Sequence, residues 1–170
     1  GSRNTAVGRG SLQNLNYDGS GYNVAVGYEA GNDITSGINN TLIGALAGDA
    51  LTTGNRNVAI GYEALSAEDG NGRNVAVGYQ SLLTQNTGAE AYNVAIGHQA
   101  GKLVEAGAFN TLIGGQAGDA LTTGSNNTVI GYNAAASAVD VSKEVTIGNA
   151  NITNIRIPSD STLKLRLRGD

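Results

Sequence analysis

The chain has few side chains that could carry out covalent or metal chemistry. Among its 170 residues there is one histidine, His98, and there is no cysteine. A catalytic triad needs a nucleophile, a base and an orienting acid, and zinc is usually held by cysteine or by several histidines. No serine or carboxylate is spaced from His98 in a way that suggests a triad. We therefore predict that the chain is not an enzyme and that it has no catalytic, metal or cofactor-binding residues.

Aromatic rings that recur at one position of a repeat are a second kind of candidate site. Exposed rings offer a large contact area at a low cost in side-chain entropy, so a ladder of them could bind a glycan or a receptor surface. The alternative is that the rings only cover a corner of the chain or a neighbouring chain. The rings follow a recurring glycine in five copies of the repeat: Tyr28, Tyr62, Tyr79, His98 and Tyr132.

The elements that must position these rings are copies of one short repeat. Asn57-Val58-Ala59-Ile60-Gly61 recurs with small substitutions at short and nearly constant steps along the chain. Residues 23–54 also align without a gap on residues 93–124, which indicates duplication of a 70-residue block. A fixed short period indicates stacked units that each contact only their neighbours. The closing glycines are Gly8, Gly27, Gly44, Gly61, Gly78, Gly97, Gly114, Gly131 and Gly148. The asparagines four positions earlier are Asn4, Asn23, Asn40, Asn57, Asn74, Asn93, Asn110 and Asn127, with Glu144 in the last copy.

The residues between each asparagine and its glycine predict a β-strand. The position before the glycine is always Val or Ile, and the position two residues earlier is Val or Thr. β-Branched residues at alternate positions favour a strand. A coil of about 17 residues fits two short strands and two turns. We predict an all-β fold, a parallel β-roll or β-solenoid of about nine coils of 17–19 residues.

The middle position of each predicted strand indicates a partner chain. It is mostly Ala or Leu, so both faces of the strand are apolar, and no amphipathic helix in the sequence could cover a second apolar face. We expect small residues such as Ala59 and Ala76 to pack against another copy of the chain. Among the cyclic symmetries, we predict a homotrimer, with three chains about one axis. The asparagine column is expected to bond the backbone at a corner and the amide in the coil above.

The repeat resembles a known family. Asn-Val-Ala-Ile-Gly, with a small residue three positions after the glycine and a Gly-Asn turn before the next copy, resembles the head repeat of trimeric autotransporter adhesins over roughly residues 3–150. It is also similar to repeat arrays of bacteriophage tail fibres, and residues 144–156 resemble the segment before a self-cleaving chaperone in some fibres. The resemblance implies a left-handed, intertwined homotrimer. The period here is longer than that of the commonest adhesin-head repeat.

Charge and hydropathy limit the kinds of binding partner and indicate where the domains begin and end. The net charge is −4, which argues against nucleic acid as a binding partner. The sequence contains no run of 18 or more apolar residues, so we expect no insertion into a membrane. Residues 1–2 are expected to be an expression scar, residues 3–150 the repeat domain, and residues 151–170 a C-terminal capping strand. Its alternating apolar and basic residues would protect an open end of the stack.

These patterns predict a structural and adhesive protein. The resemblance points to a rigid trimeric segment of a phage tail fibre, located on the virion and attached to a host-surface receptor or glycan. The alternative is the head of a bacterial trimeric adhesin at the outer-membrane surface, binding host matrix or cells. An ice-binding solenoid is less favoured, because paired threonines recur only once in each duplicated block. A fibre-borne glycan hydrolase would need paired acids in a groove.

Overall fold

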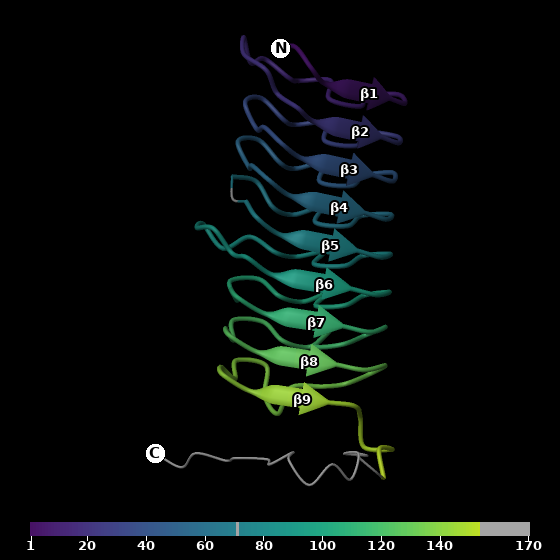
Figure 1. Ribbon diagram of the computed structural model, residues 1–170, viewed down its shortest axis with the longest axis vertical. Coiled ribbons are helices and arrows are strands. Elements are labelled where there is room, and N and C mark those ends of the chain that lie inside the picture. Colours follow the sequence, from purple (N-terminus) through teal and green to yellow (C-terminus); the bar gives the residue numbers. More distant parts are fainter. Residues whose placement is uncertain (71, 154–170) are drawn as a thin grey trace, which may run out of the picture.

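The computed structural model describes residues 1–70 and 72–153, and within them the chain forms one stack of coils (Figure 1). Nine three-residue strands form a single parallel sheet in chain order. The strands are β1 (Thr5–Val7), β2 (Val24–Val26), β3 (Thr41–Ile43), β4 (Val58–Ile60), β5 (Val75–Val77), β6 (Val94–Ile96), β7 (Thr111–Ile113), β8 (Thr128–Ile130) and β9 (Val145–Ile147). The predicted parallel β-solenoid of short, regularly repeating coils is confirmed.

Each strand pairs with the next at the same place in the repeat. Val58 pairs with Val75, for example, and Ala59 pairs with Ala76. Equivalent residues of successive strands therefore lie next to one another, which keeps one set of side chains on each face over the whole sheet. This fixed register is the reason that the sequence repeat becomes straight columns of side chains.

The core of each coil lies behind the middle residue of the strand. Ala25, Leu42 and Leu112 have no exposed surface, and neither does Leu51, which comes from the returning part of the chain. The prediction that the middle position faces another copy is therefore wrong: the chain covers this column itself. The physical reason is the pleat, because the buried asparagine two positions earlier and the middle residue point to the same side of the strand.

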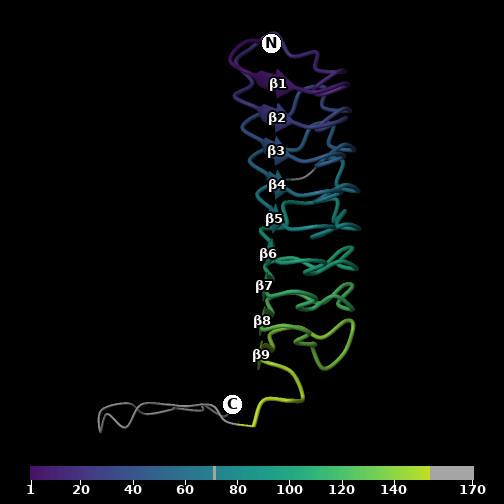
Figure 2. The same ribbon diagram turned by 90° about the vertical axis from the view of Figure 1, so that its right-hand side faces the viewer.

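The first and third residues of the strands point the other way and form what we call the outer face. Every one of them is exposed or half-buried, as with Ile96, which is 40% exposed. Figure 2 shows the strands toward one side of the stack, with the larger part of each coil on the other side. Within the described residues, nothing of the chain covers the outer face.

The rest of each coil consists of turns. The prediction of a second strand in every coil is wrong for the described residues, which hold one strand per coil and a single isolated bridge between Ser2 and Ser20. The turns still bond from coil to coil, as where the Gly48 N–H donates to the Ala64 carbonyl at 2.9 Å. Residues with positive φ alternate with others directly after each strand, as at Gly44, Leu46 and Gly48, and turn the chain away from extended backbone there.

The glycine that closes each strand lets neighbouring coils approach. Gly61 has a φ of +136°, and a Cβ there would lie 2.3 Å from the carbonyl oxygen of Gly78 in the next coil. A side chain at this place would therefore need a strained backbone and would push the coils apart. The recurrence of glycine is explained by stacking and not by flexibility.

The predicted capping strand lies, from residue 154 on, outside the described residues. The part of the chain that the structure describes contains no helix that is long and apolar enough to cross a membrane.

Candidate functional site

A ladder of buried asparagines runs along the start of the sheet. The Oδ1 of Asn40 accepts a hydrogen bond from the backbone N–H of Asn57 at 2.9 Å, and the Nδ2 of Asn40 donates to the Gly54 carbonyl at 2.8 Å. The amides thus bond backbone groups of the next turn and do not bond each other. Because unpaired buried backbone groups are costly, we assign this column to holding the coils together. The predicted column consists of Asn23, Asn40, Asn57, Asn74, Asn93, Asn110 and Asn127, and the neighbouring glycine column of Gly27, Gly44, Gly61, Gly78, Gly97, Gly114 and Gly131.

The ladder changes in one of the 19-residue coils. The Nδ2 of Asn74 is buried and has no hydrogen-bond partner in the described residues. In its neighbour Asn93, the Nδ2 donates to the Gln85 Oε1 at 2.6 Å as well as to the Gly107 carbonyl at 2.7 Å. The buried Gln85 replaces the apolar residue found at this place in most coils, and the buried Glu68 does so in the preceding coil.

Glu144 ends the ladder and uses its carboxylate differently. Its backbone N–H still donates to the Asn127 Oδ1 at 2.9 Å. Its side chain accepts hydrogen bonds from the Ser137 hydroxyl, from the Ser137 N–H at 2.9 Å and from the Thr146 hydroxyl at 2.8 Å. These bonds, led by that of the Ser137 hydroxyl, lower the pKa of the Glu144 carboxyl.

Three of the five predicted rings form a continuous stack at the edge of the sheet. Tyr62 and Tyr79 lie with ring centroids 5.5 Å apart, and Tyr79 and His98 lie 5.1 Å apart. Tyr28 and Tyr132 are separated from this stack by coils that carry Ala45 and Gly115 at the same position. Tyr28 contacts a cation instead, because the Arg9 guanidinium lies 5.4 Å from the centre of its ring.

Polar side chains run beside this stack. The Gln99 Nε2 donates to the Gln80 Oε1 at 2.9 Å, and the Gln80 Nε2 donates to the Glu63 Oε2 at 2.8 Å. A hydrogen bond to Glu63 and its negative charge raise the pKa of Tyr62. Because the ring faces cover one another, this side of the sheet exposes the edges of the rings and the row of hydrogen-bonded Gln99, Gln80 and Glu63 side chains.

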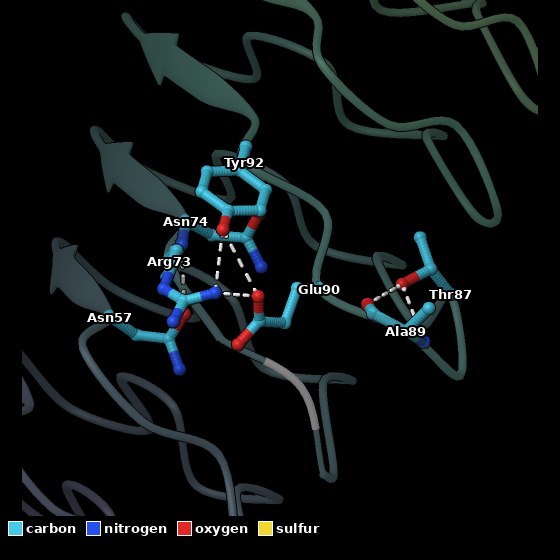
Figure 3. Close-up of polar contacts among 7 residues, drawn as sticks. All are labelled: Asn57, Arg73, Asn74, Thr87, Ala89, Glu90 and Tyr92. Atoms are coloured by element: carbon cyan, nitrogen blue, oxygen red, sulfur yellow. Dashed lines mark hydrogen bonds and ion pairs between the residues drawn. The ribbon is translucent and has the colours of Figure 1, made fainter.

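The sequence analysis missed a second set of aromatic contacts at the opposite edge (Figure 3). The Arg73 guanidinium lies 5.2 Å from the centre of the Tyr92 ring, which stacks on Phe109 at 5.6 Å. Arg73 also forms an ion pair with Glu90 and donates to the Tyr92 hydroxyl at 2.6 Å. A signal was present, because the equivalent positions near the start of the chain repeat the motif: Arg3 lies 5.4 Å from the Tyr22 ring.

The outer face is the largest candidate interaction surface. Its side chains are all Val, Ile or Thr, so it carries no charge. Nine strands at about 4.8 Å spacing and three residues long give roughly 40 Å by 10 Å, or about 400 Å². An apolar patch of this size is comparable to the largest one on a typical monomer, and such patches are often functional. The first residues of the strands are Thr5, Val24, Thr41, Val58, Val75, Val94, Thr111, Thr128 and Val145, and the third residues are Val7, Val26, Ile43, Ile60, Val77, Ile96, Ile113, Ile130 and Ile147.

Ionisable groups do not gather elsewhere in a way that suggests a metal. In the described part of the chain, no cluster of three or more His, Cys, Asp or Glu side chains is placed to hold an ion.

Comparisons with protein-family profiles, curated proteins and solved structures find no match to this chain. The fold and its surfaces define the class of the protein: it is a repeat protein of the β-solenoid type, with an apolar face that residues 1–70 and 72–153 leave uncovered.

Proposed function

We propose that the chain is a structural and adhesive segment of a fibre, in which copies of the chain associate through their outer faces. The observation that carries this proposal is the outer face itself, a flat and uncharged array of β-branched side chains that the described chain leaves uncovered. Covering such a surface is favourable in water, and another copy offers a surface of the same length and flatness.

The shape of the molecule supports a mechanical role. Consecutive coils are joined by the strand ladder, by backbone bonds between turns and by the asparagine column. Opening one coil would break all three kinds of contact at once and would expose the outer faces of the associated chains. Such a rod is suited to holding a distal part at a distance from its base.

The resemblance of the repeat to phage tail fibres and to adhesin heads supports three chains per assembly. A phage fibre on the virion, attached to a receptor or glycan of the host surface, is the setting that we favour. The head of a bacterial trimeric adhesin is the second candidate, because the exposed stack of Tyr62, Tyr79 and His98 could contribute to cell binding.

The test of self-association is the mass in solution by light scattering. A species near three times 17.1 kDa is expected for the natural sequence. The variant Ile96→Glu should lower the mass, because it places a charge on the outer face. Leu103→Glu is a matched control, since Leu103 is 45% exposed but lies on the returning segment. A folded monomer for the natural sequence would refute the proposal.

A further inference from the structure

Arg56 differs from the other described arginines. Its side chain is exposed and, within the described residues, it makes no hydrogen bond, ion pair or ring contact. Each of the others lies against a tyrosine of the next coil, and two of them also form an ion pair with a nearby glutamate. These contacts are Arg3 with Tyr22, Arg9 with Tyr28 and Glu29, and Arg73 with Tyr92 and Glu90.

Glu63 lies at the other end of the same strand. Its Oε2 accepts a hydrogen bond from Gln80, but no cation of the described chain pairs with it. Arg56 lies shortly before β4 and Glu63 lies shortly after it, so the strand itself separates them. A positive and a negative side chain therefore lie on opposite edges of the outer face within one coil.

The duplicated half of the chain changes both residues together. The corresponding positions in that half are Asn126 and Asn133, so the ionic pair becomes a pair of amides. The second half therefore keeps polar side chains at both positions but lacks their charges.

One column of side chains on each edge carries charges of a single sign. We call the residues just before the asparagine column the leading column: Arg3, Tyr22, Asn39, Arg56, Arg73, Tyr92, Phe109, Asn126 and Lys143. The residues two positions after the closing glycines form the trailing column: Gly10, Glu29, Leu46, Glu63, Gln80, Gln99, Gln116, Asn133 and Ala150. The leading column has cations and no acid, and the trailing column has acids and no cation.

The direction of packing decides which columns meet. Rotation about an axis parallel to the stack places the leading column of one copy beside the trailing column of the next, at the same height, because a rotation involves no shift along its axis. Antiparallel packing of two outer faces would instead place the cationic leading columns together, which is unfavourable.

We propose that copies of this chain pack with their stacks parallel, and that Arg56 of one copy forms an ion pair with Glu63 of the next copy. The inference rests on the self-association proposed above and adds its direction and one contact. In a ring of three copies, the leading edge of each copy contacts the trailing edge of the next, so one kind of contact closes the assembly.

Thiol cross-linking tests the contact directly, because the chain has no cysteine of its own. The double variant Arg56→Cys/Glu63→Cys, treated with a short bismaleimide, should give covalent species of two and three chains on a denaturing gel. Arg56→Cys alone should stay a single chain. The control Arg56→Cys/Asp69→Cys places the second thiol on the returning part of the same coil, and it should also stay a single chain.

The outcomes separate the two proposals. If light scattering shows an oligomer but the double variant does not cross-link, or if Arg56→Cys cross-links alone, parallel packing through this contact is wrong while self-association stands. If the untreated variants and the natural sequence are all folded monomers, both proposals fail.

A charge exchange provides an independent test. Arg56→Glu and Glu63→Arg should each raise the apparent dissociation constant of the assembly by about fivefold, as expected for an exposed pair worth about 1 kcal/mol. The double exchange Arg56→Glu/Glu63→Arg should recover most of the affinity. Two losses that simply add in the double variant would contradict the contact.

Discussion

The Oδ1 of Asn110 accepts a hydrogen bond at 2.9 Å from the backbone N–H of Asn127, one coil further along the stack. The Nδ2 of Asn110 donates at 2.9 Å to the carbonyl of Gly124. One side chain thus satisfies two backbone groups, and the side chain itself is buried. Removing it would leave both groups without this partner.

We expect Asn110→Ala to lower the free energy of unfolding by about 2–4 kcal/mol, because two backbone groups lose their partner. Asn74→Ala is the matched control. Its Oδ1 accepts from the Asn93 N–H at 3.0 Å, but its Nδ2 has no partner in the described residues. The loss for Asn74→Ala should be smaller. Urea unfolding followed by circular dichroism measures both, and equal losses would argue against the role of the second bond.

The packing of Leu42 against Gly48 predicts a rescue. A Cβ on Gly48 would lie 2.8 Å from the Leu51 Cδ1 and 2.9 Å from the Leu42 Cδ2, and Gly48 has a φ of +56°. Some coils with Ala in the middle of the strand carry Leu at the position of Gly48, as Ala59 and Leu65 do, and Leu65 also has positive φ (54°). The coils of Ala25 and Ala95 carry glycine there. Gly48→Leu alone should therefore be strongly destabilising, by about 3 kcal/mol or more, since it overpacks the core.

Adding Leu42→Ala to Gly48→Leu should restore part of that stability, because it removes one of the two leucine side chains, Leu42 and Leu51, that a Cβ at position 48 would meet. Leu42→Ala alone should cost about 2–5 kcal/mol, as expected for a cavity in a core. The measurement is a double-mutant cycle by thermal or urea unfolding. Losses that add without any rescue would show that the two positions do not share space.

The hydrogen bonds to Glu144 predict a dependence of stability on pH. They lower the pKa of this carboxyl below its usual value of 4.5. The folded state therefore favours the ionised form, and the stabilisation is present above the unfolded pKa and is lost as the pH falls through the folded pKa. Glu144→Gln should be less stable than the natural sequence at pH 7, and the difference should shrink below about pH 4.5.

Asp49 is a control, because its carboxyl should change stability with pH in the opposite direction to that of Glu144. Burial raises the pKa of its carboxyl, although the Ser66 hydroxyl donates to it at 2.5 Å. Its ionisation therefore opposes folding as the pH rises above its usual value of 3.8. The difference in stability between Asp49→Asn and the natural sequence should shift in favour of the variant from pH 3 to pH 7. A shift in the same direction as for Glu144→Gln would contradict the assignment.

Tyr79 is the central ring of its stack, so its removal should lower the free energy of unfolding more than the removal of an exposed side chain usually does. Tyr79→Ala loses contacts with Tyr62 and His98, and each aromatic pair is worth about 0.5–1.5 kcal/mol beyond its buried area. We expect a loss of about 1–3 kcal/mol in the free energy of unfolding, the sum of the two pairs. Tyr132→Ala is the control, because Tyr132 is 71% exposed and has no stacked ring in the described chain. Similar losses for both variants would exclude a role for stacking.

The sequence by itself determined the repeat and the strand in each coil. Asparagine, two β-branched residues and glycine at fixed places, as in residues 57–61, leave little choice of backbone. The asparagine marks a corner, the Val and Ile favour extended backbone, and the glycine permits the positive φ and close approach that stacking requires. A regular step then places each copy on the previous one.

The tertiary structure decided which face of the strand is inside. Both faces of β4 are apolar, so hydropathy could not separate Ala59 from Val58 and Ile60, and the choice from the sequence was the wrong one. The returning part of the chain made the decision, because it closes over the side that holds the buried Asn57 and Ala59. The repeated Arg and Tyr positions indicated the contact of Arg73 with Tyr92, but its geometry and the ion pair with Glu90 depend on how the longer coil closes, which the tertiary structure decided.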